Sequence, residues 1–414
     1  MNDWQFLTLK NSPIEIIDGD RGANYPNQAD FFDAGFCLFL NTGNVTRNGF
    51  NFSNCSFVTE EKDRKLRKGK LQRYDIVLTT RGTVGNVAYY DDGVGFENIR
   101  INSGMVIMRP NREQIEPLYL YHYLQSPLFE LQVKSFLTGS AQPQLPIGIM
   151  QLLEIPLPSL EEQRKIAAIL STWDEAIGLV EQLIAVLGRR KQALMQLLLT
   201  GEVRFAGFDG EWAEVELQTQ LSAMTDYVAN GSFEALRLNV TVTEVPDHAL
   251  YVRLTDLRKG INHSNQKYVN QSSYEFLSKS ALYGHEILIA NIGENVGEVI
   301  LMPIPNMPAT IAPNMIIMRA NSVTDPRFLY YYLSSPIGQR NISVTISGSG
   351  QPKLNKTELR RIQTLKIPFA EQRKVADIIE TCDMEIAAQL SIIDHMQTQK
   401  RGLMQQLLTG QVRV

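Results

Sequence analysis

The sequence predicts an α+β protein in which two mixed domains, related by a pseudo-two-fold repeat, are joined by two long helices that pair as an antiparallel coiled coil. The first observation is an internal repeat: EEQRKIAAIL (161–170) returns as AEQRKVADII (370–379), and ALMQLLLTGEVRF (193–205) returns as GLMQQLLTGQVRV (402–414). The second is that both repeated tails carry apolar residues at heptad spacing, whereas the segment before each tail mixes strand-like and helix-like runs.

The repeat continues upstream of the tails at the same interval, but more faintly. TGSAQPQL (138–145) resembles SGSGQPKL (347–354), while residues 10–70 and 220–280 share almost nothing. The chain therefore consists of two half-molecules, each with a divergent front part and a nearly constant tail. We expect four segments, namely a first domain at 1–157, a central helix at 158–203, a second domain at 204–368 and a distal helix at 369–414.

Both tails predict long helices whose apolar seams need a partner. Pro158-Ser159 is a start signal for the first helix and Gly201 a cap for its end. Lys191 and Lys400 interrupt the two seams at equivalent positions. The apolar seam residues are Ile166, Leu170, Trp173, Ile177, Val180, Ile184, Leu187, Leu194 and Leu198, and then Val375, Ile379, Cys382, Ile386, Ile393, Met396, Leu403 and Leu407. The simplest partner for one tail is the other tail, and the alternative is that each helix packs only on its own domain.

The front parts predict compact domains with twisted sheets. Runs rich in β-branched or aromatic residues and bounded by turn formers are typical of strands, and they are CLFLNTGNV, YDIVLTT, GMVIMRP, ALYVRLTDL, EILIANI and NMIIMRA. PLYLYHYL (117–124) and RFLYYYL (327–333) have helical spacing instead. RFAGFDGEW (204–212), with two Gly and an Asp, reads as the turn that joins the halves.

Composition sets the broad class of the protein. The chain is 44% hydrophobic and 20% charged with a net charge of −4, which is typical of a globular protein and leaves a nucleic-acid partner open. The three cysteines are scattered, so neither a disulfide framework nor a zinc site is expected. No apolar stretch is long enough for a membrane span, and a cytoplasmic protein is the expectation. The five histidines are isolated, and no Walker A, GxSxG or HExxH motif indicates an active site.

Polar side chains in the front parts are candidates for contacts with DNA, although each pattern is also typical of a solvated loop or helix face. A basic run at 60–73 is suited to a phosphate backbone, and Arg, Asn and Gln side chains are suited to base edges. The Gln residues of the two GSxQPxL loops have either a DNA contact or a turn as their shared role. The candidates are Arg21, Asn24, Gln28, Lys62, Arg64, Lys65, Arg67, Lys68, Lys70, Arg81, Arg100, Gln142, Arg253, Arg258, Lys259, Gln351 and Lys353.

These motifs resemble those of one family, the specificity subunits of type I restriction–modification systems. The paired EQRK…TGxVR tails are similar to the conserved central and distal regions of that family, and RFAGFDGEW is similar to the junction that opens its second variable domain. DGDRGANYP, RGTVGNVAYY and INSGMVIMRP resemble motifs of its target-recognition domains. The second domain departs from the pattern, because Asn291 stands where Arg81 stands in the first.

The resemblance implies a non-catalytic DNA specificity subunit. Each variable domain would read one half of a bipartite asymmetric target, and the helices would set the spacer length and bind two methyltransferase subunits. Endonuclease/translocase subunits would join that core. No cofactor is expected on this chain, whereas S-adenosylmethionine, ATP and Mg are expected on the partner subunits. The alternative is a coiled-coil scaffold that binds proteins rather than DNA, and the sequence lacks the motifs of a self-sufficient methyltransferase or nuclease.

Overall fold

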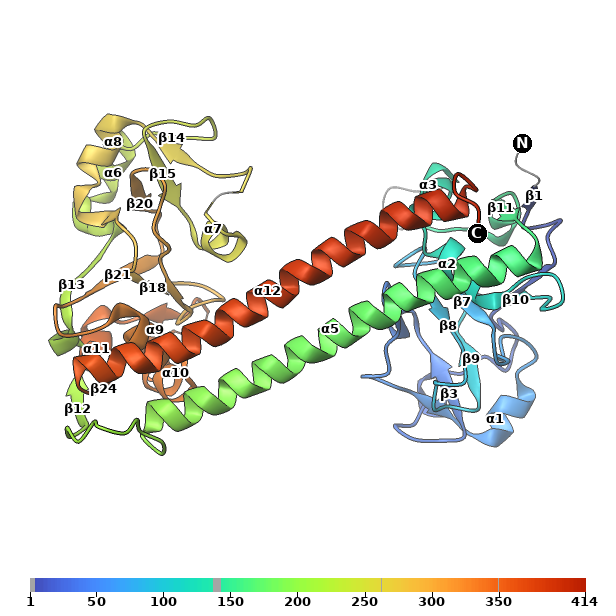
Figure 1. Ribbon diagram of the computed structural model, residues 1–414, viewed down its shortest axis with the longest axis horizontal. Coiled ribbons are helices and arrows are strands. Elements are labelled where there is room, and N and C mark those ends of the chain that lie inside the picture. The colour runs from blue at the N-terminus through green and yellow to red at the C-terminus, as the bar shows by residue number, and fades with distance from the viewer. Residues whose placement is uncertain (1–3, 137–142, 262, 349) are drawn as a thin grey trace. The chain divides into compact units, whose positions relative to one another are not determined.

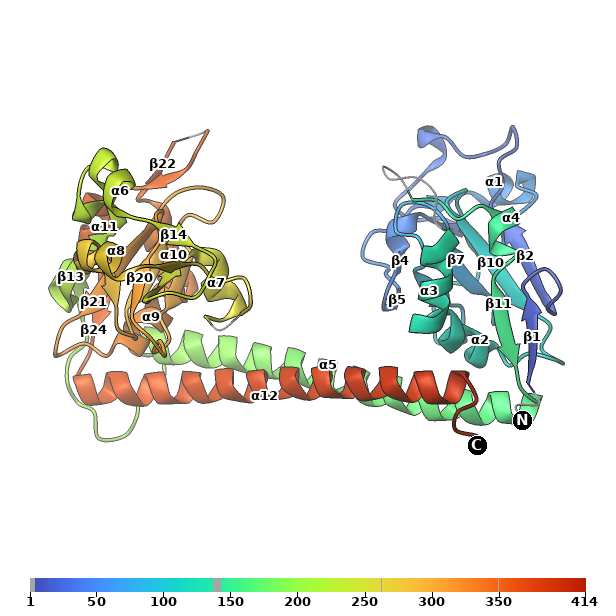
Figure 2. The same cartoon turned by 90° about the horizontal axis from the view of Figure 1, so that it is seen from above.

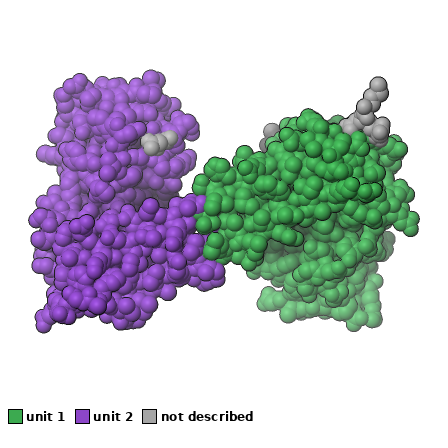
Figure 3. All heavy atoms as spheres, in the orientation of Figure 1, with its two compact units in different colours: residues 1–183, 389–414 green, residues 184–388 purple. Residues whose placement is uncertain are grey.

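The computed structural model describes residues 4–136, 143–261, 263–348 and 350–414. The chain forms two compact units, one of residues 1–183 with 389–414 and one of residues 184–388 (Figure 3). Each unit contains one mixed domain and a part of each of the two long helices. The units therefore divide the chain within the helices, whereas the segments expected from the sequence divide it at their ends.

The first domain is built around an antiparallel four-stranded sheet of order β2-β10-β7-β8. Its two central strands, β10 and β7, are almost wholly buried because both faces are covered. Ile76, Leu78 and Met108 face helices α2 and α3, and Val77 and Ile107 face a second sheet of order β6-β3-β9. The strands are β1 (Gln5–Thr8), β2 (Ile14–Asp18), β3 (Cys37–Leu40), β4 (Val45–Thr46), β5 (Gly49–Phe50), β6 (Phe57–Val58), β7 (Ile76–Thr79), β8 (Val87–Tyr89), β9 (Ile99–Ile101), β10 (Met105–Pro110) and β11 (Glu154–Leu157).

Helices α2 (Pro117–Leu124), α3 (Pro127–Phe136) and α4 (Ile147–Met150) cover one face of this sheet (Figure 2). The short helix α1 (Glu60–Lys65) lies beside the second sheet instead, where its Asp63 pairs with Arg100 of β9. Tyr119 of α2 and Phe129 of α3 are fully buried in the core. Burial of aromatic side chains of this size contributes on the order of 2–3 kcal/mol each. The helix predicted over PLYLYHYL is confirmed as α2.

The second domain repeats the same scaffold. Its four-stranded sheet has the order β13-β21-β18-β19, and a five-stranded sheet of order β14-β16-β15-β20-β17 covers one face. The strands are β12 (Ala213–Glu216), β13 (Leu221–Asp226), β14 (Val242–Thr243), β15 (Ala249–Val252), β16 (Tyr268–Val269), β17 (Ala281–Leu282), β18 (Ile287–Ala290), β19 (Val299–Leu301), β20 (Ala309–Ile311), β21 (Met315–Ala320), β22 (Ile346–Ser347), β23 (Lys353–Leu354) and β24 (Gln363–Lys366). The helices are α6 (Phe233–Asn239), α7 (Leu254–Lys259), α8 (Gln271–Phe276), α9 (Pro326–Ser334), α10 (Pro336–Ser343) and α11 (Lys356–Arg361).

The predicted strands and the predicted α+β class with its repeat are confirmed. Each of the six strand-like runs contains a strand, namely β3, β7, β10, β15, β18 and β21. RFLYYYL lies in α9, and RFAGFDGEW is a connection without helix or strand before β12. The two sheets also agree in register, since Asp18 pairs with Val106 at the end of β2 and Asp226 pairs with Ile316 at the end of β13.

The two tails form the long helices α5 (Leu160–Thr200) and α12 (Phe369–Leu408) (Figure 1). The Ser159 Oγ accepts a hydrogen bond from the Glu162 N–H at the start of α5, and Gly201 ends it with a φ of 77°. All of the seam positions predicted from the heptads are buried or half-buried. The seam therefore faces protein along both helices.

The helices run antiparallel in each unit. In the first unit Ile166 and Leu170 of α5 share a core with Leu407 of α12. In the second, Leu198 of α5 shares a core with Val375 of α12. Both cores also contain side chains of the mixed domains, so the antiparallel pairing and the packing of each helix on a domain occur together.

The arginine of each repeated TGxVR motif contacts a buried glutamate at the start of the other tail. In the first unit Arg413, from TGQVR, donates to the Glu162 carboxylate at 2.5 and 2.8 Å, and the Trp4 indole donates to the same carboxylate at 3.2 Å. In the second unit Arg204, from TGEVR, donates to Glu371, as does Trp212. The end of each tail is thus held by the start of the other.

Candidate nucleic-acid interface

The loops at one edge of the first domain's sheet bring several candidate residues together. β2 and β7 end, and β10 begins, at this edge, because β10 is antiparallel to both. The N–H groups of Thr80 and Arg81 donate to the Gly104 carbonyl at 2.8 and 3.2 Å, and the Arg21 guanidinium donates to the Ser103 carbonyl at 3.4 Å. Arg21 and Arg81 therefore meet around the turn that precedes β10.

A buried carboxylate fixes the loop that carries Arg21. The Asp20 side chain accepts hydrogen bonds from the backbone N–H groups of Gly22, Arg67 and Lys68, the closest two at 2.7 and 2.6 Å. Burial raises the pKa of Asp20, but these N–H groups outweigh burial and the net pKa is lowered. Asp20 thus ties the 18–28 loop to the end of the basic run.

Most of the basic run is neutralised within the domain. Lys62 pairs with Asp30 at 2.8 Å and Lys70 with Asp63 at 2.6 Å, so both ammonium groups are held by carboxylates. The structure does not present these two as free phosphate contacts. Arg64 and Lys65 pair with Glu60 and Glu61 one turn back on α1, at 2.7 and 2.6 Å. Those two pairs are exposed and contribute little to stability, so both side chains remain available to a phosphate.

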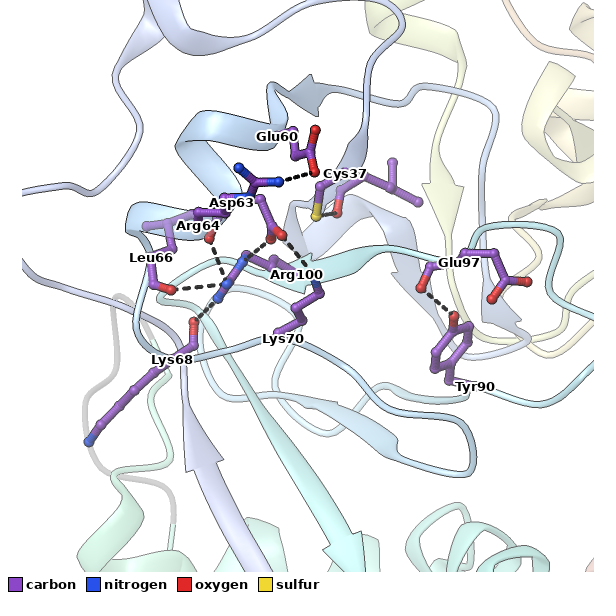
Figure 4. Close-up of polar contacts among 11 residues, drawn as sticks. Cys37, Glu60, Asp63, Arg64, Leu66, Lys68, Lys70, Tyr90, Glu97 and Arg100 are labelled. Carbon is purple, nitrogen blue, oxygen red and sulfur yellow. Dashed lines mark hydrogen bonds and ion pairs between the residues drawn. The ribbon is translucent and has the colours of Figure 1, made fainter.

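Arg100 is a structural residue, and its assignment as a DNA contact is corrected. Its side chain is 6% exposed and donates to the Asp63 carboxylate at 2.5 Å. It also donates to the carbonyl oxygens of Asp63, Leu66 and Lys68 (Figure 4). Burial raises the pKa of Asp63, but Lys70 and Arg100 outweigh burial and the net pKa is lowered. The sequence gives no signal of this burial, because alternation in Ile99-Arg100-Ile101 places Arg100 on the face opposite the two isoleucines.

The remaining candidates of the first domain face solvent. Arg67, Lys68 and Arg81 are exposed, and among the described residues none of their side chains has an ion pair. Arg21 is half exposed and pairs with Asp18 at 3.2 Å. The exposed Asn24 donates to the Lys65 carbonyl, and Gln28 is exposed at the start of a short 3-10 helix. Gln142 lies outside the described residues.

The candidates of the second domain divide in the same way. Arg253 precedes α7, where it donates to Asp256 at 2.6 Å and to the Asn265 carbonyl, and its side chain is 32% exposed, so its contact with DNA stays a prediction. Arg258 pairs with Glu298 on the surface. Lys259, Gln351 and Lys353 are exposed. Of these, Lys353 lies at the sheet edge that corresponds to the Arg81 edge of the first domain.

That edge of the second domain holds a cavity of about 680 Å³. Asp226 at the end of β13, Asn291 after β18 and Met315 at the start of β21 line it. Lys356, which pairs with Asp226 at 2.5 Å, and Phe233, which is 83% exposed, line it too. Sequence patterns did not single out Asp226 or Phe233, which lie in the non-matching stretch 220–280, or Lys356, which lies just after the matched loop at 347–354. The expectation that Asn291 stands where Arg81 stands is corrected. The Asn291 carbonyl accepts from Leu354 as the Thr80 carbonyl accepts from Leu145, so Asn291 corresponds to Thr80.

The two sheet edges offer groups that can bind a ligand. The first domain presents the cations of Arg21 and Arg81, and the second presents the amide of Asn291 and the ring of Phe233 on a cavity. Within the part of the chain that the structure describes, no cluster of His, Cys, Asp or Glu is placed to hold a metal ion. None of the described helices is long and apolar enough to span a membrane.

The family model of the type I restriction modification DNA specificity domain matches residues 1–189 and 251–393. The chain belongs to this family. The two matched stretches contain Arg21, Arg67 and Arg81 at the sheet edge of the first domain and Asn291 at that of the second, whereas β13 with Asp226 lies outside them. This type I specificity family accounts for both halves of the repeat.

Named relatives and solved structures agree with the assignment. The putative type I restriction enzyme MjaX specificity subunit of Methanocaldococcus jannaschii is 26% identical over 385 residues, which cover 89% of this chain and 86% of that protein. The StySPI specificity subunit of Salmonella potsdam is 22% identical over 378 residues, covering 87% and 78%. The S subunit structure from M. genitalium has a TM-score of 0.56 at 16% identity, covering 99% of this chain and 97% of that one. A chain from a type I restriction–modification assembly structure has a TM-score of 0.58 at 18% identity, covering 98% and 97%.

The main expectations from the sequence are therefore confirmed. The chain is a type I specificity subunit, and its family is one of DNA specificity domains rather than of catalytic domains. The coiled-coil scaffold without DNA is not favoured. Because these solved structures are 16% and 18% identical to this chain, their similarity shows the fold alone. The roles of individual side chains therefore rest on the geometry given above.

Proposed function

We propose that each of the two mixed domains reads one half of a bipartite asymmetric DNA target within a type I restriction–modification complex. The observation that carries this proposal is that one scaffold occurs twice, with the same strand order, and presents different side chains at the same sheet edge. Arg21, Arg67, Lys68 and Arg81 offer cations at this edge of the first domain, and Asn291 offers an amide at the corresponding edge of the second. Two different readers select two different half-sites.

The long helices would set the spacer between the half-sites. Support comes from α5, a single helix of 41 residues that belongs to both units. At a rise of 1.5 Å per residue it is about 60 Å long. A rod of fixed length between two readers selects one separation of half-sites along the duplex.

The helices would also bind two methyltransferase subunits, and endonuclease/translocase subunits would join them. Leu179 and Leu183 lie one turn apart on α5 and are 65% and 42% exposed. Exposed leucines at this spacing support a contact with a partner protein. S-adenosylmethionine, ATP and Mg would be held by the partner subunits, and a complex that modifies host DNA would act in the cytoplasm.

Mapping methylated bases tests this function. The chain is purified with its methyltransferase subunits, and the complex is expected to methylate a bipartite sequence only when both halves are present. Duplexes with one half scrambled are the matched controls. Methyl transfer or DNA cleavage by the chain alone, or methylation that ignores one half, would contradict the proposal.

Changing the length of the helices tests the spacer separately. One heptad is inserted into each helix, between Leu183 and Ile184 and between Ala388 and Gln389, so that the seam pattern is kept. Seven residues add about 10 Å of helix, which corresponds to about three base pairs. The preferred spacer should lengthen while both half-sites stay the same, and an unchanged spacer would exclude the helices as its determinant.

A further inference from the structure

Asn291 of the second scaffold corresponds to Thr80 of the first, one residue before Arg81. The Thr80 N–H donates to the carbonyl of Gly104 and the Thr80 carbonyl accepts from Leu145, just as the Asn291 N–H donates to the carbonyl of Asn314 at 2.8 Å and the Asn291 carbonyl accepts from Leu354. The residues that follow, Arg81 and Ile292, form the corresponding β-bridges with Gln144 and Lys353. The main chain is therefore equivalent at this edge, but the polar side chain that it offers is Arg81 in the first domain and Asn291 in the second.

The Asn291 amide has no hydrogen bond within the part of the chain that the structure describes. It lines the cavity of the second domain, and its Oδ1 is buried without a hydrogen bond among the described residues. An unsatisfied buried acceptor is unfavourable, so the amide is stabilised when a donor enters the cavity. The terminal torsion of Asn is broad, which lets the amide turn its oxygen toward such a donor.

Apolar surface lies on the same cavity. Phe233 is 83% exposed there, although a Phe side chain is stabilised by burial. In the major groove an A·T pair presents the N6 amino donor and the N7 acceptor of adenine together with the methyl group of thymine. An amide and an aromatic ring on one cavity match these three features. By comparison, the exposed Arg81 guanidinium has no side-chain partner among the described residues and matches the O6 and N7 acceptors of guanine.

We propose, resting on the function above, that Asn291 and Arg81, which lie beyond the ends of β18 and β7, each determine one base pair of a half-site. Asn291 reads an adenine, with Oδ1 accepting from N6 and Nδ2 donating to N7, and Phe233 contacts the methyl group of the paired thymine. Arg81 reads a guanine in the other half-site. The two half-sites differ because the two sheet edges offer different side chains.

Exchange of the two side chains tests the inference. The complex with methyltransferase subunits is prepared with the wild-type chain, with Asn291→Arg and with Arg81→Asn, and the methylated motif of each is mapped. Asn291→Arg should replace one A·T pair of the second half-site by G·C and leave the first half-site unchanged, and Arg81→Asn should do the reverse. Glu275→Gln, an exposed change on α8, is the control and should keep the motif.

If an exchanged variant does not methylate DNA, a binding measurement still tests the inference. Each adenine of the second half-site is replaced in turn by 7-deazaadenine, which lacks the N7 acceptor. At one position the wild-type complex should lose affinity by about 5- to 150-fold, and a complex with Asn291→Ala should show no such loss there. A second half-site without an A·T pair, a motif unchanged by Asn291→Arg, or equal sensitivity of Asn291→Ala would overturn the inference. A wild-type complex that methylates no bipartite motif would instead overturn the proposed function.

Discussion

Lys400 of α12 forms an ion pair with Asp174 of α5, and the two residues belong to the first unit. The second unit contains the matching pair with the helices exchanged, since Lys191 of α5 donates to Asp383 of α12 at 2.5 Å. Both lysines stand at the seam positions that interrupt the heptads. Each helix thus has one lysine in place of an apolar seam residue, and an aspartate of the other helix neutralises that lysine.

Removing one partner of this pair should cost more than removing both. The Lys400 side chain is 11% exposed, whereas Asp174 is 44% exposed and partly screened by water. Asp174→Asn leaves the lysine without its partner in the seam and should lower the free energy of unfolding by about 1–3 kcal/mol. The double variant Asp174→Asn/Lys400→Met should be closer to the wild type in denaturant unfolding. If the single and double variants unfold together, the seam does not depend on this charge pair.

The Arg413 contact should hold the end of the chain in the first unit. Glu162 is 6% exposed, and Arg413→Ala leaves its carboxylate with the Trp4 indole alone. Since a buried charge without its partner is strongly unfavourable, we expect a loss of about 3 kcal/mol or somewhat less, because Arg413 itself is half exposed. Arg413→Lys, which keeps the charge but not the two parallel hydrogen bonds, should lie between. Denaturant melts that coincide for all three chains would show that the contact is not stabilising.

His122 should make the first unit sensitive to acid. Burial, with Lys400 nearby, lowers the pKa of His122 from 6.5 to about 3, so the folded chain holds it neutral. Between these values the unfolded chain binds the extra proton, so the stability is full above about pH 6.5 and declines toward pH 3. The slope from this group is about 1.4 kcal/mol per pH unit.

A tyrosine variant isolates that slope. The second unit has Tyr331 at the equivalent place, and its hydroxyl donates to Asp383 at 2.9 Å. His122→Tyr should therefore fit the first unit and remove the contribution of the histidine, which is measured as the free energy of unfolding at several pH values between 4 and 8 for both chains. Parallel curves for the wild type and the variant would exclude His122 as the sensitive group.

Arg67 and Lys68 should contact DNA phosphates without choosing the sequence. Replacing either by alanine should weaken binding of the assembled complex to specific and non-specific duplexes by similar factors. The slope of log affinity against log salt should fall in magnitude by about one for each residue removed. Lys134→Ala, an exposed change on α3, serves as the control. A change in the methylated motif, or an unchanged slope, would contradict this role.

The exposed leucines of α5 should be needed for assembly. Leu179→Asp and Leu183→Asp place charges on the surface proposed for a methyltransferase subunit and should reduce its co-purification at least tenfold. Leu131→Asp is a matched control, because Leu131 is 64% exposed on α3. The three chains should have similar unfolding midpoints, since none of these side chains is buried. Normal assembly of both α5 variants would exclude this face.

The sequence predicts the scaffold better than the interface, for a physical reason. Heptads, strand-like runs and the repeat report burial, which is periodic, and so α5, α12 and the main strands follow from them. Whether a basic residue is free depends on which acid the fold brings beside it. Asp30, which holds Lys62, lies outside the basic run, and Asp63 within the run gives no signal that it holds Lys70 rather than another of its basic neighbours. The cavity residues Asp226 and Asn291 come together only because β13 and β18 both pair with β21, and local patterns do not report that register.

The discontinuous first unit has a consequence for synthesis of the protein. Residues 184–388 form a continuous unit, but the core of the first unit includes Met404, Leu407 and Leu408 near the end of the chain. The nascent chain therefore carries Ile166 and Leu170 without this part of their cover until Leu408 has left the ribosome. A ribosome that stops after residue 388 releases an intact second reader beside an uncovered apolar surface, which makes such products substrates for chaperones and proteases. Completion of the first reader thus requires translation to pass the whole of the second.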